Sequence, residues 1–162
     1  MIKIVGAQGI IRNVDHFLDN ILKFADKNDI LIQVFDADMI YGKNHIISSF
    51  EHALRAIERN TNTTNSLDKE ILLYASGERQ LKLAIPKIGI KRGKANIAFL
   101  LISEKNEIID KIIDELLDTT CLIQDNQVID GDKSTLINFG INDNEIKTVP
   151  YAKYEDLILE KV

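Results

Sequence analysis

Few side chains in this sequence are of types that perform chemistry, and those few are scattered along the chain. The three histidines are His16, His45 and His52, and the one cysteine is Cys121. His45 and His52 fall within one predicted helix, where their spacing separates them by about 10 Å along the axis. Two imidazoles that far apart cannot bind the same metal ion, and the sequence offers no cluster of cysteine ligands. We therefore expect no metal site and no cofactor, and we expect Cys121 to be a buried apolar filler.

The strongest acidic candidate is the pair Asp36 and Asp38, which follows an apolar run. Carboxylates at a strand end can hold Mg²⁺, so this pair could serve a small magnesium-dependent enzyme acting on phosphate esters. Carboxylates at such positions also hydrogen-bond to turns, and the pattern favours that explanation. Residues 89–95 (GIKRGKA) match an ATP-binding loop poorly, because no Ser or Thr follows the lysine and the segment precedes a predicted strand. We expect no enzymatic activity and no catalytic residue.

The distribution of charge is more informative. The stretch 79–103 holds six basic residues and no acidic one, although the formal net charge of the chain is −5. The rest of the chain holds 14 Lys and Arg against 25 Asp and Glu. Such segregation steers a polyanion or an acidic partner toward one face. A chance grouping of helix and loop lysines would give the same pattern, so both explanations stay open. The six residues are Arg79, Lys82, Lys87, Lys91, Arg92 and Lys94.

Length and composition indicate one domain over 1–162. A chain of 162 residues that is 45% hydrophobic can bury a single core. The longest apolar run, 97–102, is too short to cross a membrane, and the first residues lack the layout of a signal peptide. A cytoplasmic location is therefore expected.

The hydrophobic patterns predict a mixed α/β fold in which a small sheet of three or four strands packs with several helices. Strands are expected at 1–5, ending at Gly6 or Gly9, at 30–35, at 95–102 and near 121–123. Helices are expected at 14–28, 44–59, 67–75, 79–88, 107–117, 142–147 and 154–159, and a polar loop at 130–134. A strand at 70–75 is the alternative to the third helix.

Particular residues predict where helices end and which way they face. Asn13 is a plausible N-cap, Asn28 ends the first helix, and Gly77 suits the left-handed position after a helix. In the helix at 79–88 the spacing predicts one face of apolar residues that point inward and an opposite face of basic residues that point outward. The inward residues are Leu81, Ala84, Ile85 and Ile88, and the outward ones are Arg79, Lys82 and Lys87.

A longer pattern covers about 30–102. Residues 69–102 read KEILLYASGERQLKLAIPKIGIKRGKANIAFLLI, and upstream VFDAD at 34–38 is followed by Gly42, His45 and Ala53. This order resembles the small kinase-regulatory subunit of the KEOPS (EKC) complex, the family of the PRPK-binding protein TPRKB. The C-terminal third adds little to the resemblance.

The resemblance implies a non-catalytic subunit. Members of this family bind and stimulate the small atypical kinase/ATPase of KEOPS and help to deliver tRNA by holding its single-stranded 3′ CCA end. The complex installs threonylcarbamoyl on the adenosine beside the anticodon. The expected partners are therefore that kinase and the 3′ end of tRNA, with no membrane partner. The sequence does not indicate which surface meets the kinase.

A single-stranded RNA end is held by basic groups on phosphates, by stacking surfaces and by polar groups that read base edges. We hypothesise that two neighbouring blocks supply these groups: Tyr74, Ser76, Gly77, Arg79 and Gln80, then Lys91, Arg92 and Lys94. The alternatives are a hydrogen-bond network of Glu70, Arg79 and Gln80 that fixes the corner at Gly77, and core packing for Tyr74. A ligand-sensing regulatory domain without an RNA role is a further alternative.

Overall fold

The computed structural model describes residues 1–105, 108 and 110–162. Their contacts group into two compact units: unit 1 comprises Met1–Ala37 and Ile90–Val128, and unit 2 comprises Asp38–Gly89 and Ile129–Val162. Neither unit is one continuous stretch, so no single linker in the sequence separates them. The assignment of 1–162 to one domain stays a prediction.

Unit 1 contains a four-stranded sheet, which confirms the predicted mixed α/β class. The strands are β1 (Ile2–Ile11), β2 (Leu31–Asp36), β3 (Gly93–Ile102) and β4 (Ile123–Gln124). Their order is β2-β3-β1-β4, and every neighbouring pair is antiparallel. β1 and β3 pair along their whole length, from Ile2 opposite Ile102 to Ile11 opposite Gly93.

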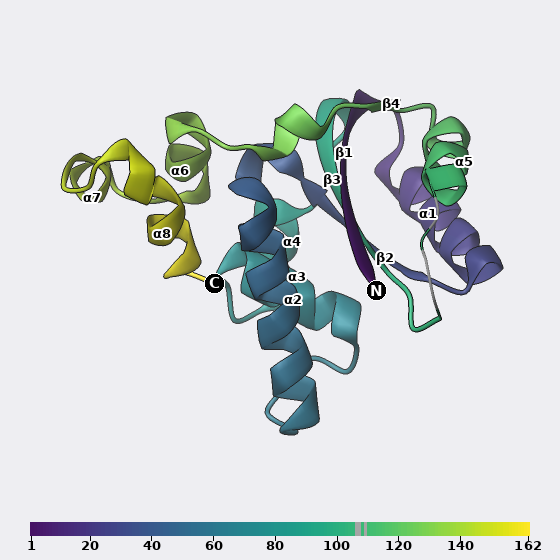
Figure 1. Ribbon diagram of the computed structural model, residues 1–162, viewed down its shortest axis with the longest axis horizontal. Helices are drawn as coiled ribbons and strands as arrows, with labels where there is room; N and C mark the ends of the chain where they lie inside the picture. The colour runs from purple at the N-terminus through teal and green to yellow at the C-terminus, as the bar shows by residue number, and fades with distance from the viewer. Residues whose placement is uncertain (106–107, 109) are drawn as a thin grey trace. The chain divides into compact units, whose positions relative to one another are not determined.

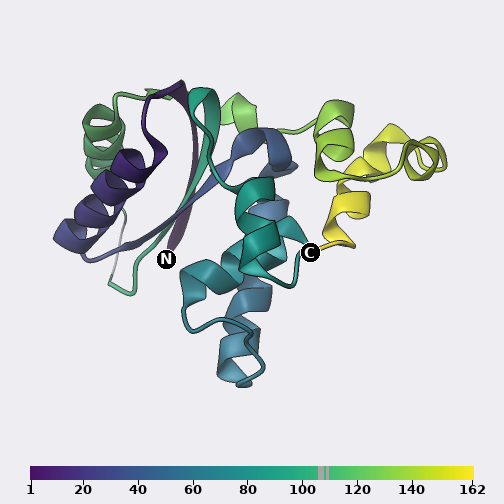
Figure 2. The ribbon, with the colours of Figure 1, turned by 180° about the vertical axis from the view of Figure 1, so that it is seen from behind.

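Two helices, α1 (Val14–Asn28) and α5 (Asp110–Thr120), cover one face of this sheet (Figures 1 and 2). Successive strand residues point to opposite faces, so Val5, Ala7 and Ile11 of β1 share the covered face. They form one buried cluster with helix residues such as Phe17 and Leu116. The core of unit 1 therefore lies between the sheet and these two helices.

The ends of α1 confirm the predicted capping. The Asn13 side chain accepts a hydrogen bond from the His16 N–H, which satisfies a backbone donor that the first turn leaves unpaired. After Asn28 the chain turns at Asp29, which has a φ of 54°. The predicted helix at 107–117 corresponds to α5, although Glu107 and Ile109 lie outside the described residues.

The predicted end of β1 at Gly6 or Gly9 is wrong, because the strand continues through both glycines to Ile11. Each glycine allows another segment to approach the strand closely. A Cβ at Gly6 would lie 2.4 Å from the Asp125 carbonyl oxygen, and one at Gly9 would lie 2.5 Å from Leu122 Cδ2. Backbone crowding therefore requires glycine at position 6, whereas at Gly9 the Leu122 side chain could move aside, and neither glycine interrupts the strand.

Unit 2 is helical. Its helices are α2 (Gly42–Glu58), α3 (Leu67–Ser76), α4 (Leu81–Ile88), α6 (Lys133–Phe139), α7 (Asp143–Lys147) and α8 (Tyr154–Leu159). Short 3₁₀ segments lie at Ala37–Met39, Asn126–Ile129 and Tyr151–Lys153. α3 packs against α2 and α4, and α8 packs against α2 and α6. The segment at 67–75 is thus a helix, and the strand alternative is wrong.

Two predictions for the C-terminal third need correction. The predicted polar loop at 130–134 is shorter than expected, because α6 begins at Lys133. The Asp132 carboxylate and the Thr135 hydroxyl form a reciprocal capping box at the start of this helix. Cys121 was expected to be buried but is exposed, in the corner after α5, where it adopts a left-handed conformation (φ 55°). The short helices predicted at 142–147 and 154–159 are confirmed as α7 and α8. None of the described helices is long and apolar enough to span a membrane.

Candidate nucleic-acid interface

The predicted block 74–80 forms the corner between α3 and α4 in unit 2. α3 ends at Gly77, which has a φ of 68° and whose N–H donates to the Tyr74 carbonyl. A Cβ at this position would lie 2.8 Å from the Lys161 carbonyl oxygen, so the corner requires glycine for both conformation and space. Because α4 begins at Leu81, Arg79 and Gln80 belong to the turn, where both are exposed.

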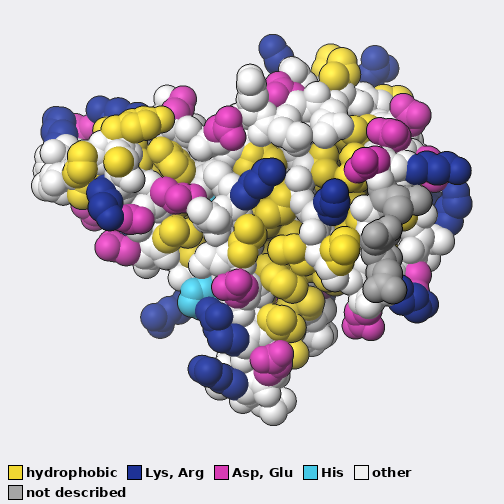
Figure 3. Space-filling model, in the orientation of Figure 1, with side chains coloured by type: hydrophobic (Ala, Val, Ile, Leu, Met, Phe, Trp, Pro, Cys, Tyr) yellow, Lys and Arg dark blue, Asp and Glu magenta, His cyan; other side chains and the backbone are white. Residues whose placement is uncertain are grey.

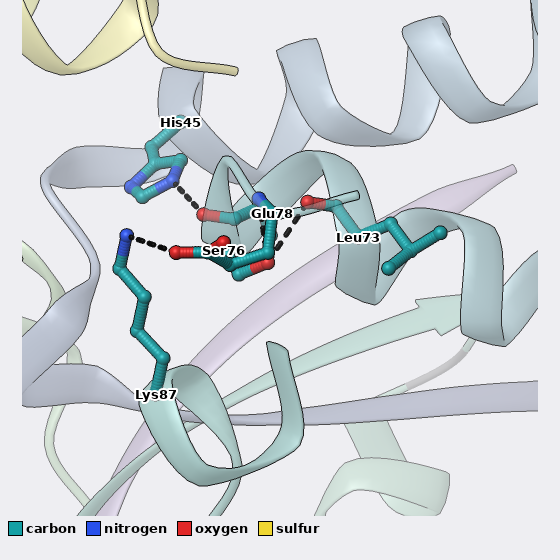
Figure 4. A network of polar contacts seen from close by, with 6 residues as sticks. His45, Leu73, Ser76, Glu78 and Lys87 are labelled. Carbon is teal, nitrogen blue, oxygen red and sulfur yellow. Dashed lines mark hydrogen bonds and ion pairs between the residues drawn. The ribbon is translucent and has the colours of Figure 1, made fainter. Parts of the chain in front are cut away.

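A buried histidine fixes the end of α3 against the start of α2 (Figure 4). His45 lies 2.8 Å from the Ala75 carbonyl oxygen through Nε2, and its Nδ1 accepts a hydrogen bond from the Tyr41 N–H. These partners assign the neutral tautomer with its proton on Nε2. Burial, together with the positive charge of Lys87, lowers the pKa of His45 from 6.5 to about 4, although the hydrogen bond to Ala75 acts in the opposite direction. His45 therefore positions the corner and is not available to a ligand.

The remaining polar groups of the corner divide into structural and exposed ones. Ser76 is fully buried, its hydroxyl donates to the Leu73 carbonyl, and it accepts a hydrogen bond from the Glu78 N–H. Glu78 also forms an ion pair with Lys87, at 3.4 Å, as Figure 4 shows. RNA contact by Ser76 and Gly77 stays a prediction, whereas Arg79 and Gln80 present their side chains to solvent.

Lys87 departs from the predicted outward orientation. Its Nζ lies 4.0 Å from the centre of the Phe139 ring, a cation–π arrangement that joins α4 to α6. The same helix also corrects the predicted inward face, because Ala84 and Ile88 are buried but Ile85 is 54% exposed. With Leu83, which is 51% exposed, and the exposed Pro86, the outer surface of α4 presents apolar side chains beside the exposed Lys82.

Tyr74 stacks on His52, which was not among the predicted site residues. The Tyr74 and His52 rings lie 5.4 Å apart with 23° between their planes, and both residues are half-buried. Desolvation lowers the pKa of His52, and the positive charge of Arg55 adds to this effect. Figure 3 shows a histidine beside Lys and Arg side chains over the C-terminal half of α2. A partly exposed pair of neutral rings next to a guanidinium is a surface on which a nucleobase can stack.

Glu70 has a structural role, but its partners are in the loop before α3 and not at the corner of Gly77. Its carboxylate is buried and accepts hydrogen bonds from the Thr63 N–H, the Thr64 N–H and the Thr64 hydroxyl. It therefore ties the loop before α3 to the first turn of that helix. Arg79 and Gln80 have no place in this network as the structure describes it.

The second predicted block lies in unit 1, at the start of β3. Lys91 forms an ion pair with Asp36 at 2.9 Å, while Arg92 and Lys94 are exposed. Gly93 between them has a φ of 108°. The two blocks that are neighbours in the sequence thus belong to different units.

The acidic pair proposed for magnesium is engaged differently. Asp36 binds Lys91, and Asp38 is exposed in the 3₁₀ segment that follows β2. Among the described residues no group of three or more His, Cys, Asp or Glu side chains is placed to hold a metal ion. The Asp36–Lys91 ion pair favours a structural role for the first carboxylate.

The comparisons decide the family. The model of the kinase binding protein family CGI-121 matches residues 10–162. The chain belongs to this family. The resemblance to KEOPS small subunits is thereby confirmed, and the match extends through the C-terminal third that the motifs did not cover. No curated protein sequence matches the chain significantly. As a CGI-121 protein, the chain is a kinase-binding protein with a kinase as its partner.

Proposed function

We propose that this CGI-121 protein is a non-catalytic subunit of a KEOPS complex that binds the 3′ CCA end of tRNA and stimulates the partner kinase. In this role it supports threonylcarbamoyladenosine modification by positioning tRNA and the kinase. The observation that carries the tRNA part is the stacked pair Tyr74 and His52 with Arg55, on α3 and α2. Arg79 and Gln80 are exposed in the turn that follows α3. Its mechanism is a raised local concentration of tRNA near the catalytic subunits.

The chemistry of each group suits an unpaired RNA end. The Tyr74–His52 pair offers a flat surface for a base, Arg79 offers a cation for a phosphate, and Gln80 can both donate to and accept from a base edge. The contribution of Arg92 and Lys94 is sequence-independent attraction to phosphate, because both are exposed cations next to a strand end.

The kinase side of the function has its own surface. We assign kinase docking to the outer face of α4, where Leu83, Ile85 and Pro86 are exposed in a helix of eight residues. Exposed apolar side chains grouped on one short helix are costly in water and are typical of the centre of a protein interface. The family assignment supplies the occupant, which is the partner kinase.

The test of the tRNA role is binding of the purified chain to a complete tRNA and to the same tRNA lacking its 3′ CCA, at two salt concentrations. We expect a preference for the complete tRNA that Arg79→Glu reduces by roughly tenfold, because a phosphate contact is replaced by repulsion. Lys27→Glu, which changes an exposed lysine on α1, is the matched control and should change the affinity little.

Two outcomes would contradict the proposal. Equal affinity for both tRNAs would remove recognition of the CCA end from this subunit. A loss of thermal stability in Arg79→Glu with tRNA binding retained would assign Arg79 to the structure of the corner. Kinase binding, measured on the same samples, reports the docking function separately.

A further inference from the structure

One edge of β1 is left open beside a cleft in unit 1. β4 pairs with β1 only where Ala7 faces Gln124 and Gln8 faces Ile123. β1 itself continues to Ile11, with β3 on its other side. Among the described strands, none lies on the β4 side of β1 beyond Gln8.

The corner after α5 explains why β4 is so short. Cys121 turns the chain through a left-handed conformation, and the N–H groups of Cys121 and Leu122 bond back to the carbonyls of Asp118 and Leu117. Leu122 then passes close to Gly9, and strand pairing begins only at Ile123. The helix end therefore prevents β4 from reaching Ile10.

The backbone groups of Ile10 point toward this open edge. In an antiparallel sheet the N–H and C=O of one residue point to the same side, and the side alternates along the strand. Gly6 bonds toward the β4 side, since its N–H donates to Asn126 Oδ1 and its carbonyl accepts from the Asp125 N–H. Ile10 lies four residues after Gly6, an even number, so its N–H and C=O also point to the β4 side of the strand. A longer β4 would occupy that place.

The side chains around the open edge combine apolar surface with positive charge. Ile10 and Ile123 are 68% and 71% exposed, and both lie on the sheet face opposite α1, where they are diagonal neighbours. The exposed Lys94 is directly across from Ile10, and the exposed Arg12 follows β1. Figure 3 shows apolar side chains between basic ones above the end of β1.

The adjacent cleft has a volume of about 650 Å³, and none of the described residues that line it is acidic. Arg12, His16 and Asn20 supply polar groups, and Phe17 and Thr120 form part of its wall. Asp125, the acidic residue that follows β4, is held by Gln8 Nε2 and by the Gln127 N–H. In a chain with a net charge of −5, this edge therefore favours an acidic occupant.

We propose that the open edge of β1 and its cleft bind an extended acidic segment of a partner protein by strand addition. The segment pairs with the N–H and C=O of Ile10, places apolar side chains against Ile10 and Ile123, and directs the carboxylates of its other face to Arg12, which lines the cleft. A peptide backbone matches the alternating donors and acceptors of a strand edge, whereas RNA does not. The exposed apolar surface also consists of isoleucines, which stack poorly on bases. The proposal stands apart from the tRNA role.

The probe is a fluorescent seven-residue peptide of alternating valine and glutamate, titrated against the full chain by fluorescence anisotropy. We expect saturable binding with a dissociation constant in the range of about 10 µM to 1 mM, as for a short strand that gains few contacts. Two matched peptides carry N-methyl groups on either the odd or the even residues. One of the two should lose binding by roughly tenfold or more and the other should retain it, because only alternate N–H groups face the edge.

Variants locate the site. Ile10→Asp and Arg12→Glu should each weaken peptide binding by roughly tenfold, whereas Leu22→Asp, at an exposed leucine on α1, should leave it unchanged. Ile10 is exposed, so its replacement leaves the core intact, and amide exchange of β1 checks this. No saturable binding, equal effects of both methylation patterns, or an unaltered affinity in Ile10→Asp would overturn the proposal. Displacement of the peptide by an oligouridylate of higher affinity would overturn it in favour of an RNA site.

Discussion

His45 is a buried residue whose two ring nitrogens are both committed to backbone partners, and this has a consequence for stability. The pKa of His45 is lowered from 6.5 to about 4, so the folded protein resists protonation that the unfolded chain accepts. The stabilising contribution of neutral His45 is therefore complete above pH 6.5 and is lost as the pH falls from 6.5 toward 4. A shift of this size corresponds to about 3 kcal/mol.

The expected result is a steep fall in the free energy of unfolding across this interval, measured by urea denaturation at several pH values. His45→Gln should be less stable at neutral pH but should show a flatter dependence, because the titrating group is gone. The control is His16→Gln, which replaces an exposed histidine and should keep the wild-type slope. Parallel slopes in all three proteins would contradict the assigned role of His45.

Gly77 is a second single residue whose replacement should lower the stability of the fold. Gly77→Ala adds a Cβ at positive φ and places it 2.8 Å from the Lys161 carbonyl oxygen, so we expect a loss of about 2–4 kcal/mol. Gly140→Ala is the matched control, since Gly140 also ends a helix at positive φ but has no atom within 4 Å of the added Cβ. Its cost should be only about 1 kcal/mol. Thermal unfolding of both variants measures the difference, and equal losses would show that the close approach of Lys161 has no energetic effect.

Among the elements, α6 depends on its cap. Helices of seven residues are too short to be stable alone, and α6 carries Phe139, which packs edge-on against His45 and beneath Lys87. Asp132→Ala removes the capping box and should reduce the free energy of unfolding by about 1 kcal/mol. Asp130→Ala, an exposed neighbour outside the box, should have little effect. Chemical denaturation compares the two, and similar losses would argue against the cap.

The sequence predicted the ends of helices well where a single residue determines the end. Asn13 and Gly77 act through their own side chain or backbone, so their positions in the sequence are sufficient. β1 was predicted too short because Gly6 and Gly9 resemble breaks, and only the close approach of the Asp125 backbone shows why residue 6 is glycine. Ile85 was placed inside because periodicity identifies an apolar face but does not say whether the chain itself or a partner covers it.

The candidate interface was predicted less completely for a related reason. Arg79 was predicted to lie on the outer face of a helix, whereas α4 begins only at Leu81 and leaves Arg79 and Gln80 exposed in the turn after Gly77. The partner of Tyr74 is His52, and that pair exists only because α3 packs on α2, which a sequence without a fold does not reveal. The basic residues after Gly89 are near the corner in sequence and yet belong to the other unit.

For the whole molecule, the assigned kinase surface makes a prediction about assembly. Ile85→Asp should weaken binding to the partner kinase by roughly tenfold or more, because a charge is placed at the centre of an apolar interface. The melting temperature should change little, since the side chain is exposed in the free protein. Leu22→Asp on α1 is the control. Isothermal titration with the purified kinase measures the effect, and unchanged binding in Ile85→Asp would exclude the outer face of α4.

The strand order of unit 1 also determines when it can fold during synthesis. β1 and β2 do not pair with each other, since each is hydrogen-bonded to β3, which lies between them. The ribosome therefore releases two apolar strands and the apolar face of α1 well before the strand that joins them, and all of unit 2 up to Gly89 emerges in between. A nascent chain halted before Gly93 has no sheet to form and exposes strand edges to other chains. The amount of folded protein in the cell should therefore depend on the speed of translation and on chaperones, and not only on the stability of the folded protein.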